Sequence, residues 1–357
     1  MNPIIKEDIE NILAAPSMDW SRFSKKKVLI TGAYGMLASY LVYTLCFLNE
    51  KDKDFDCRIL ALGRNKKKMT DRFGEFLDKP YFIPLYESAL GMHEVEGNLD
   101  FIIHAASPTD PRSYLTAPSA VIGANVNATM ELLEMAVRKK SQGFLFISSG
   151  EAYGVLEKEV IYEEDGGMVK ISEPRNVYAM SKRLGERLCI DYAENKGVPT
   201  KIVRPSHTYG PTMDIKHDGR VFADFVSDAV NGRDIVMTGD GKASRAFIYL
   251  SDAALGYFKV LLDGKNGEAY NVTNNEGIRT IRQLAEYTAS LAKPPVKAVF
   301  GTPDASYKEN ANKKASIRST EKLETLGWKA SVSPEEGFRR TVDSFRITEI
   351  GHEKRMF

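Results

Sequence analysis

Cysteine and histidine are scarce in this 357-residue chain. Its three cysteines, Cys46, Cys57 and Cys189, lie far apart and form no Cys-x-x-Cys pair, so neither a disulfide framework nor a zinc site is expected. The five histidines also lack the close spacing of metal ligands, and His104 is interpreted as a packing residue at a strand end. We therefore predict no metal site and a reducing environment.

The chain also lacks an excess of charge and a long apolar run. Lys and Arg number 49 against 48 Asp and Glu, which leaves a net charge of +1 and excludes the broad positive field of a nucleic-acid-binding protein. No apolar run is long enough to span a membrane, and the N-terminus carries acids where a signal peptide would not. We expect a cytoplasmic protein whose partner is a small molecule, with neither nucleic acid nor membrane.

Hydrophobic periodicity divides the chain into three parts. Residues 1–24 predict an N-terminal helical extension, since residues 3–14 have helical spacing that ends before Pro16. Residues 25–210 alternate short apolar strands with amphipathic segments, which predicts a Rossmann-type, doubly wound parallel sheet of the α/β class. Residues 211–357 break this rhythm and predict mainly a smaller C-terminal α/β lobe that binds the substrate. The expected strands of the sheet are 28–32, 58–62, 81–85, 100–106, 143–149 and 200–205.

A glycine-containing turn follows the first expected strand, in Thr31-Gly-Ala-Tyr-Gly-Met-Leu-Ala38. Gly32 permits a tight turn, and Gly35 lets backbone N–H groups approach a pyrophosphate at the start of a helix. The turn therefore predicts dinucleotide binding, with a plain strand-to-helix turn as the alternative. The candidate cofactor contacts here are Gly32, Tyr34, Gly35, Met36 and Leu37.

The end of the second expected strand bears on the choice of cofactor. An acid at this place would bond the ribose 2′-OH of NAD, but the sequence reads Leu62-Gly-Arg-Asn-Lys-Lys-Lys68. Arg64, with Asn65 beside it, instead suits the 2′-phosphate of NADP, and a solvated helix start is the alternative. We expect NADP or NAD as cofactor, with NADP favoured.

Tyr178 and Lys182 lie four residues apart in a segment of helical spacing, so both point from one helix face. An ammonium beside a phenol favours the phenolate, which allows Tyr178 to act as a base. Ser149 ends the fifth expected strand, where its hydroxyl can share the substrate proton. These elements meet at the carboxyl edge of a parallel sheet, which predicts a catalytic group of Ser149, Tyr178 and Lys182.

The order of these motifs resembles that of the extended short-chain dehydrogenase/reductase family, whose members modify nucleotide-linked sugars. The matching motifs, over residues 27–340, are the TGxxGxxA turn, His104-Ala-Ala-Ser107, the Asn125 segment, Ser148-Ser-Gly-Glu-Ala-Tyr-Gly154 and Tyr178-Ala-Met-Ser-Lys182. Within the family the chain is most similar to UDP-glucuronate decarboxylases. That similarity is carried by His104-Ala-Ala-Ser-Pro-Thr-Asp-Pro111, Pro174-Arg175, Asp218-Gly-Arg-Val221 and Arg245-Ala-Phe247.

The resemblance implies roles for further residues. Glu151 matches a glutamate that handles a proton near C5 of the sugar, and Gly150 stands where 4,6-dehydratases have an Asp, which disfavours simple dehydration. Lys313 stands about where similar decarboxylases have an arginine near the sugar carboxylate. Besides Tyr178 and Lys182, the implied cofactor contacts are Ala105, Ala106, Ser107, Asn125, Pro205 and His207, and the implied substrate contacts are Pro108, Arg175, Arg220, Phe222, Arg245 and Lys313.

The leading hypothesis is therefore an enzyme that acts on a nucleotide-diphosphate sugar through a C4-keto intermediate, most like a UDP-glucuronate decarboxylase. One alternative is an NADPH-dependent reductase of a nucleotide-linked keto sugar or ketose. Another is a cofactor-binding protein without turnover, which the presence of Ser149, Tyr178 and Lys182 disfavours. The resemblance also implies a homodimer formed through paired helices.

Overall fold

A seven-stranded parallel sheet forms the centre of the larger part of the molecule. The computed structural model describes residues 1–301 and 316–353, with side chains described to residue 347. The strand order is β3, β2, β1, β4, β5, β7 and β11, so the predicted doubly wound Rossmann-type sheet is confirmed. The strands are β1 (Lys27–Thr31), β2 (Arg58–Leu62), β3 (Phe82–Leu85), β4 (Phe101–His104), β5 (Gly143–Ile147), β7 (Thr200–Pro205) and β11 (Glu268–Val272).

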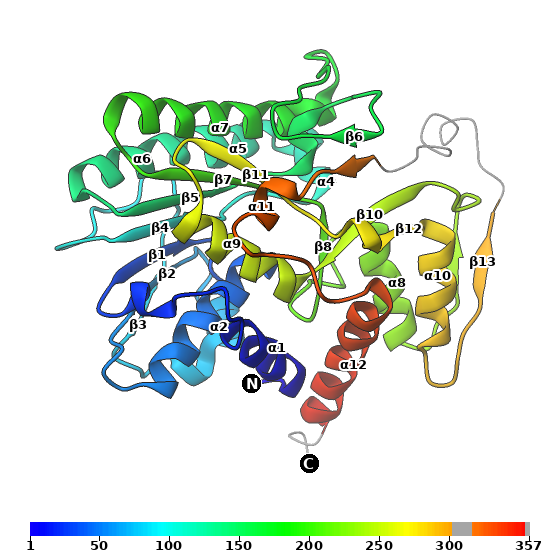
Figure 1. Ribbon diagram of the computed structural model, residues 1–357. Helices are drawn as coiled ribbons and strands as arrows, with labels where there is room; N and C mark the ends of the chain where they lie inside the picture. Colours follow the sequence, from blue (N-terminus) through cyan, green and yellow to red (C-terminus); the bar gives the residue numbers. More distant parts are fainter. Residues whose placement is uncertain (302–315, 354–357) are drawn as a thin grey trace.

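Helices cover both faces of this sheet (Figure 1). The alternation of side chains along a strand sends Val28 and Ile30 of β1 toward α2 (Met36–Lys51) and α9 (Leu250–Asp263). Leu29 points to the other face, where it packs in one cluster with residues of α6 (Ala128–Lys139) and α7 (Val177–Lys196). Because both faces are covered, the strands read as continuous apolar runs.

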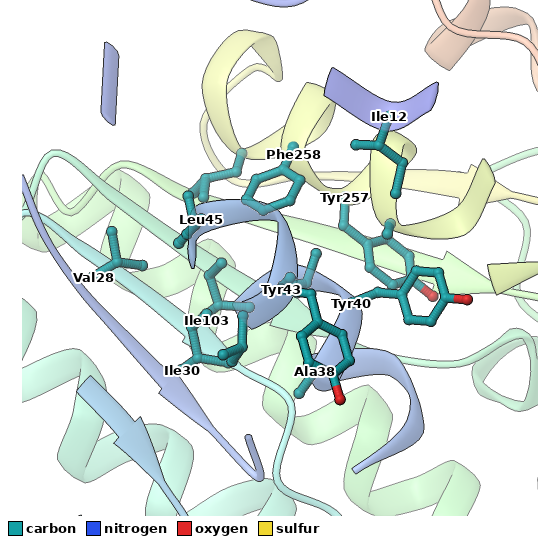
Figure 2. Packing of buried hydrophobic residues seen from close by; sticks show 14 of the residues in the cluster. Ile12, Val28, Ile30, Ala38, Tyr40, Tyr43, Leu45, Ile103, Tyr257 and Phe258 are labelled. Atoms are coloured by element: carbon teal, nitrogen blue, oxygen red, sulfur yellow. The ribbon is translucent and has the colours of Figure 1, made fainter. Parts of the chain in front are cut away.

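The predicted N-terminal helix is α1 (Pro3–Leu13), which begins at the capping side chain of Asn2. Its buried side chains Ile5, Ile9 and Ile12 join the same hydrophobic cluster as α2 and α9. Figure 2 shows Ile12 in this cluster together with Tyr257 and Phe258 of α9. The helix is therefore packed into the core of the larger part.

The smaller lobe has its own hydrophobic cluster, built around Phe222, Phe247 and Phe338. Its elements are β8 (His207–Tyr209), α8 (Val221–Val230), β9 (Ile235–Met237), β10 (Ser244–Tyr249), β12 (Ile278–Thr280), α10 (Ile281–Ser290), β13 (Ala298–Phe300) and α12 (Pro334–Glu353). The division at residue 210 remains a prediction, and α9 and β11, which follow that residue, return to the large sheet.

Short elements connect these parts. The two-stranded sheet of β6 (Val160–Ile161) and β14 (Ile317–Arg318) joins segments far apart in the sequence, and the two strands lie side by side in Figure 1. In the described residues, no helix combines the length and apolar character needed to cross a bilayer. The other elements are α3 (Lys66–Phe73), α4 (Pro111–Thr116), α5 (Pro118–Ile122), α11 (Glu321–Glu324), the π-helical turn η3 (Gly123–Asn127), and the 3-10 turns η1 (Trp20–Phe23), η2 (Gly74–Phe76), η4 (Gly150–Tyr153), η5 (Pro174–Asn176) and η6 (Asn275–Gly277).

Candidate active site

The turn between β1 and α2 has the shape that a dinucleotide pyrophosphate needs. Gly32 has a φ of 65°, and a Cβ there would lie 2.9 Å from the Cα of Ala106. Gly35 is the N-cap of α2 and makes no side-chain capping bond, so the first backbone N–H groups of the helix are not capped by their own N-cap residue. The backbone N–H groups of Ala105 and Ala106 donate to the Thr31 hydroxyl at 3.1 and 3.0 Å, which holds the end of β4 against this turn. These features fit a dinucleotide cofactor.

His104 and Asn125 lie beside the turn and are buried. The Nδ1 of His104 is 2.8 Å from the Thr31 hydroxyl and its Nε2 is 3.0 Å from the carbonyl oxygen of Ala124. Burial lowers the pKa of His104 to about 3, so the ring is neutral and serves as a structural link. The Nδ2 of Asn125 donates to the Ser181 hydroxyl at 3.0 Å, while its buried Oδ1 has no partner among the described residues. An unpaired buried acceptor in this position also fits a bound polar ligand.

The tip of β2 is open to solvent. Arg64 and Asn65 are both exposed, and the Asn65 side chain accepts a hydrogen bond from the backbone N–H of Lys68, which starts α3. The Tyr34 ring covers Gly63, where a Cβ would lie 2.8 Å from the Cδ1 of Tyr34. The structure therefore places Tyr34 and Arg64 at the same end of the cofactor turn.

Tyr178 and Lys182 lie one turn apart on α7 and are both buried. The Lys182 Nζ donates to the carbonyl oxygen of Ile147 at 2.8 Å and lies 5.6 Å from the centre of the Tyr178 ring. Burial lowers the pKa of Lys182 to about 7. Burial raises the pKa of Tyr178 to about 12, while a hydrogen bond with Ser149 acts in the opposite direction. The structure thus brings Ser149, Tyr178 and Lys182 together.

Tyr114 of α4 is a neighbour that sequence reasoning missed. Its ring stacks on that of Tyr178, with 4.8 Å between ring centres and an angle of 14° between the planes. The exposed Arg175 of η5 is close enough to affect the pKa of Tyr114. No spacing rule predicts this contact, because α4 and α7 are separate in the sequence.

Glu151 lies in η4, immediately after β5. Its backbone N–H donates to the Ser149 hydroxyl at 3.1 Å, and its side chain is exposed. The negative charge of Glu151 raises the pKa of Tyr178, so the carboxylate is within electrostatic range of the phenol. A second acid–base group therefore stands at the same strand end as Ser149.

Arg318 is the main site residue that sequence reasoning missed. β14 pairs with β6, with Arg318 opposite Ile161, and this pairing carries the guanidinium to Gly150. A Cβ added to Gly150 would overlap the guanidinium, so the absence of a side chain at Gly150 leaves room for it in this position. Lys313, which the resemblance places near the sugar carboxylate, lies outside the described residues. The short segment Ser316-Ile-Arg-Ser319 carries no signal of the long-range pairing.

Three arginines lie within electrostatic range of His207. Burial lowers the pKa of this histidine to about 3, and the charges of Arg318, Arg245 and Arg220 act in the same direction. Arg220 forms an ion pair with Asp218, its Nη2 lies 3.9 Å from the sulfur of Met36, and its Cζ lies 4.7 Å from the centre of the Phe222 ring. The cluster gives the site a positive potential suited to an anionic ligand.

The other candidate residues pack in the core or make local contacts. Phe222 is 2% exposed and packs in the core of the smaller lobe, with Arg220 over its ring. The backbone carbonyl of Ser244 accepts from Arg245 at 2.7 Å. Pro205 is buried at the end of β7. Met36, Leu37, Ser107 and Pro108 are partly buried around the turn and the end of β4.

The arrangement combines a cofactor turn, a buried phenol with a lysine and a hydroxyl, an exposed carboxylate and an arginine cluster. Such a site can hold an anionic ligand, exchange a proton at an alcohol oxygen and handle a second proton nearby. Within the described part of the chain, no three His, Cys, Asp or Glu side chains gather closely enough to hold a metal ion.

Comparisons with known proteins agree with this geometry. The model of the NAD dependent epimerase/dehydratase family matches residues 28–273. A UDP-glucuronic acid decarboxylase of Arabidopsis thaliana is 31% identical over 91% of this chain and 90% of its own length, and one of Xenopus tropicalis is 28% identical over 98% and 80%. The crystal structure of UDP-glucose 4-epimerase with UDP-glucose from Thermotoga maritima has a TM-score of 0.75 at 22% identity and covers 90% of this chain and 99% of that one. The chain belongs to the NAD dependent epimerase/dehydratase family.

Proposed function

We propose that the protein is a UDP-glucuronate decarboxylase, which converts UDP-glucuronate into a UDP-linked pentose and CO2. The observation that carries this proposal is the Arg318 guanidinium, which fills the space over Gly150 beside Glu151. A side chain at position 150, such as the aspartate of a dehydratase, would have to displace the guanidinium from this place. A guanidinium at the sugar end of the site is well suited to a carboxylate, which it can bind with two parallel hydrogen bonds.

The curated relatives support the same substrate. Several proteins named UDP-glucuronic acid decarboxylase match over nine-tenths of this chain, at 30 to 31% identity. Solved structures of similar fold include UDP-glucuronic acid 4-epimerase from Bacillus cereus with UDP-glucuronic acid and NAD, at a TM-score of 0.73. At 22% identity that structure supports the fold alone.

The first chemical step needs a base and a hydride acceptor at C4. A bound nicotinamide dinucleotide would supply the acceptor, and the same hydride would be available to reduce C4 at the end of the reaction. Tyr178 takes the proton of the C4 hydroxyl. Ser149 is hydrogen-bonded to the phenol, and Lys182 lies close to its ring. The positive charge of a bound, oxidised nicotinamide would favour the phenolate and would lower the pKa of Tyr178 from its value in the protein alone.

The C4 ketone places the C5 carboxylate in a β-keto position. The C5–carboxylate bond then breaks, CO2 leaves, and the electron pair remains as an enolate. A proton is delivered to C5 from the side where Glu151 lies, and Tyr178 returns its proton to the C4 oxygen. Arg318 holds the carboxylate before the bond breaks.

A net reductase is the second candidate function, because Arg64 favours NADP and no acid stands beside it. In that reaction hydride and the Tyr178 proton complete the chemistry at a keto sugar. One cofactor is then oxidised for each product, whereas a decarboxylase regenerates its cofactor in every cycle.

The deciding experiment incubates the protein with UDP-glucuronate and, separately, with nucleotide-linked 4-keto sugars, and counts CO2 released and cofactor consumed per product. We expect CO2 and UDP-pentose from UDP-glucuronate with no net cofactor consumption. Arg318→Ala should remove most of this activity, and Tyr178→Phe should lower it about 10²- to 10⁴-fold. Arg233→Ala, at an exposed arginine of the smaller lobe, is the matched control. Inertness toward UDP-glucuronate, with one-to-one reduction of a keto sugar, contradicts the proposal.

We further propose that the cofactor is NADP. The support is the exposed Arg64 at the tip of β2, followed by three lysines and no carboxylate before Asp71. Wild-type protein should bind NADP more tightly than NAD, and Arg64→Ala should weaken NADP alone, as measured by calorimetric titration of both cofactors. Arg58→Ala, at the other end of β2, is the control. Equal wild-type affinity for the two cofactors contradicts this choice.

We also propose a homodimer formed through the outer faces of α6 and α7. Exposed apolar side chains lie on this side of the molecule, with Met130 47% and Leu184 50% exposed. Pairing of these helices with those of a second copy would remove both side chains from water.

A further inference from the structure

We propose that Tyr153 and Asn271 are positioning residues that set Arg318 for the substrate carboxylate. The inference rests on the decarboxylase function proposed above. Both side chains are buried, and their polar atoms bind each other and the backbone of Ser319. Their effect on the substrate acts through Arg318, which they reach by a continuous set of hydrogen bonds and ring contacts.

The backbone around Arg318 is held from two sides. On the β6 side, Ile317 donates to the carbonyl oxygen of Glu159 at 2.9 Å and Ser319 donates to that of Ile161 at 2.8 Å. On the other side, side-chain amides donate to two successive carbonyl oxygens. Asn275 donates to that of Arg318 at 2.9 Å, and Asn271 to that of Ser319 at 3.0 Å. The placement of the guanidinium therefore depends on these two asparagines.

Asn271 can hold this carbonyl because its own orientation is fixed. It lies on β11, the edge strand of the large sheet, and its Oδ1 accepts a hydrogen bond from the Tyr153 hydroxyl at 2.7 Å. Both ends of the amide are thus used, one by Tyr153 and one by Ser319. Without the Tyr153 hydroxyl, the Oδ1 is a buried acceptor without a partner, which favours rotation of the amide.

Tyr153 connects Arg318 to the catalytic turn. It ends η4, the turn whose N-cap is Ser149 and whose second residue is Glu151. Its ring lies 6.0 Å from the Cζ of Arg318 and 4.6 Å from the Cζ of Arg204. Tyr153 therefore links the position of Arg318 to the turn that carries Ser149 and Glu151.

Arg204 extends the connection to α7. Its Nε and Nη2 donate to the two carboxylate oxygens of Glu186 at 2.9 and 2.6 Å, and Glu186 also accepts from the Ser148 hydroxyl. Glu186 lies one turn after Lys182 on α7. Buried hydrogen-bond networks are rigid when every member is paired. This network therefore fixes the position of Arg318 relative to Ser149 at the turn and to Lys182 on α7.

The test measures selectivity for the sugar carboxylate. UDP-glucuronate and UDP-glucose differ at C6, and both are titrated by calorimetry into cofactor-loaded protein in the Tyr178→Phe background, where turnover does not consume the ligand. Tyr153→Phe keeps the ring and removes one hydroxyl. We expect the preference for UDP-glucuronate over UDP-glucose to fall about tenfold, with UDP-glucose affinity changed less than about twofold.

Three further variants make the result specific. Asn271→Asp keeps the acceptor for Tyr153 and loses the donor to Ser319, so it should lower the preference in the same way. Tyr162→Phe changes an exposed tyrosine of the same segment and should have no effect. Adding Tyr153→Phe to Arg318→Ala should cause no further loss, because the effect acts through Arg318.

The outcomes separate the inference from the function on which it rests. If Tyr153→Phe weakens both ligands equally, or changes neither, while Arg318→Ala abolishes the preference, the positioning role is wrong and the function stands. If the protein with Arg318 intact shows no preference for UDP-glucuronate, the proposed substrate itself is wrong. Thermal unfolding of each variant identifies any variant that does not fold, and Asn271→Asp then carries the test in place of Tyr153→Phe.

Discussion

At the scale of single residues, His104 links the cofactor turn to η3 as a neutral ring. Its pKa is about 3 in the folded protein, against about 6.5 in an unfolded chain. Below pH 6.5 the unfolded chain therefore binds a proton that the folded protein does not bind until about pH 3. The stabilising contribution of His104 is complete above pH 6.5 and is lost as the pH falls toward 3.

We accordingly expect the free energy of unfolding to fall with decreasing pH in this window, by up to about 1.4 kcal/mol per pH unit for this histidine. His104→Gln should reduce that slope, as measured by chemical denaturation between pH 7 and pH 4. His93→Gln is the control, because the His93 side chain is 89% exposed. An unchanged slope in His104→Gln would show that the ring is protonated in the folded protein.

At the scale of elements, α1 is tied to three other elements by one buried carboxylate. Asp8 accepts hydrogen bonds from the hydroxyls of Tyr40 on α2 and Tyr249 on β10, at 2.6 and 2.7 Å, and from Arg340 on α12 at 2.7 Å. Burial raises the pKa of this carboxyl, and the bonds with both tyrosines and Arg340 oppose that rise. The N-terminal helix therefore joins α2 to the smaller lobe, and α1 and α12 lie close together in Figure 1.

Asp8→Ala should destabilise the protein by about 3 to 5 kcal/mol, because it leaves a buried guanidinium and two hydroxyls without their acceptor. Chemical denaturation measures the loss, and hydrogen exchange should show faster exchange in α1 and α12. Glu10→Ala, an exposed change on the same helix, should cost less than about 0.5 kcal/mol. Similar stability of the two variants would mean that apolar packing alone holds α1.

The elements that sequence reasoning predicted are those whose signal is local. The six apolar strands and α1 follow from runs and spacing within a few residues. The seventh strand, β11, was missed because Glu268–Val272 reads as part of the smaller lobe until its pairing with β7 is known. The site divides in the same way: Gly32, Tyr178 and Lys182 are visible in local motifs, whereas Arg318 depends on the pairing of β14 with β6.

At the scale of the whole molecule, the proposed dimer makes a simple prediction. Leu184→Glu places a charge in the middle of the α6–α7 face and should convert a dimer to a monomer in sedimentation or light scattering. Val236→Glu is the matched control, since this valine is 71% exposed on β9 of the smaller lobe. A wild-type protein that sediments as a monomer contradicts the proposal.

The seventh strand has a consequence for how the chain matures during synthesis. Until residue 272 has left the ribosome, β7 presents an unpaired backbone edge, which is a template for aggregation. Once β11 is added, the new edge is blunted by side chains: Glu163 accepts from the backbone N–H of Asn271, and Lys322 donates to the carbonyl oxygen of Ala269. One of these groups precedes the strand in the chain and the other follows it by about 50 residues. A nascent chain that ends before Lys322 therefore exposes backbone groups of the sheet edge that can pair with another chain. A chain extended past Lys322 covers both ends of this edge.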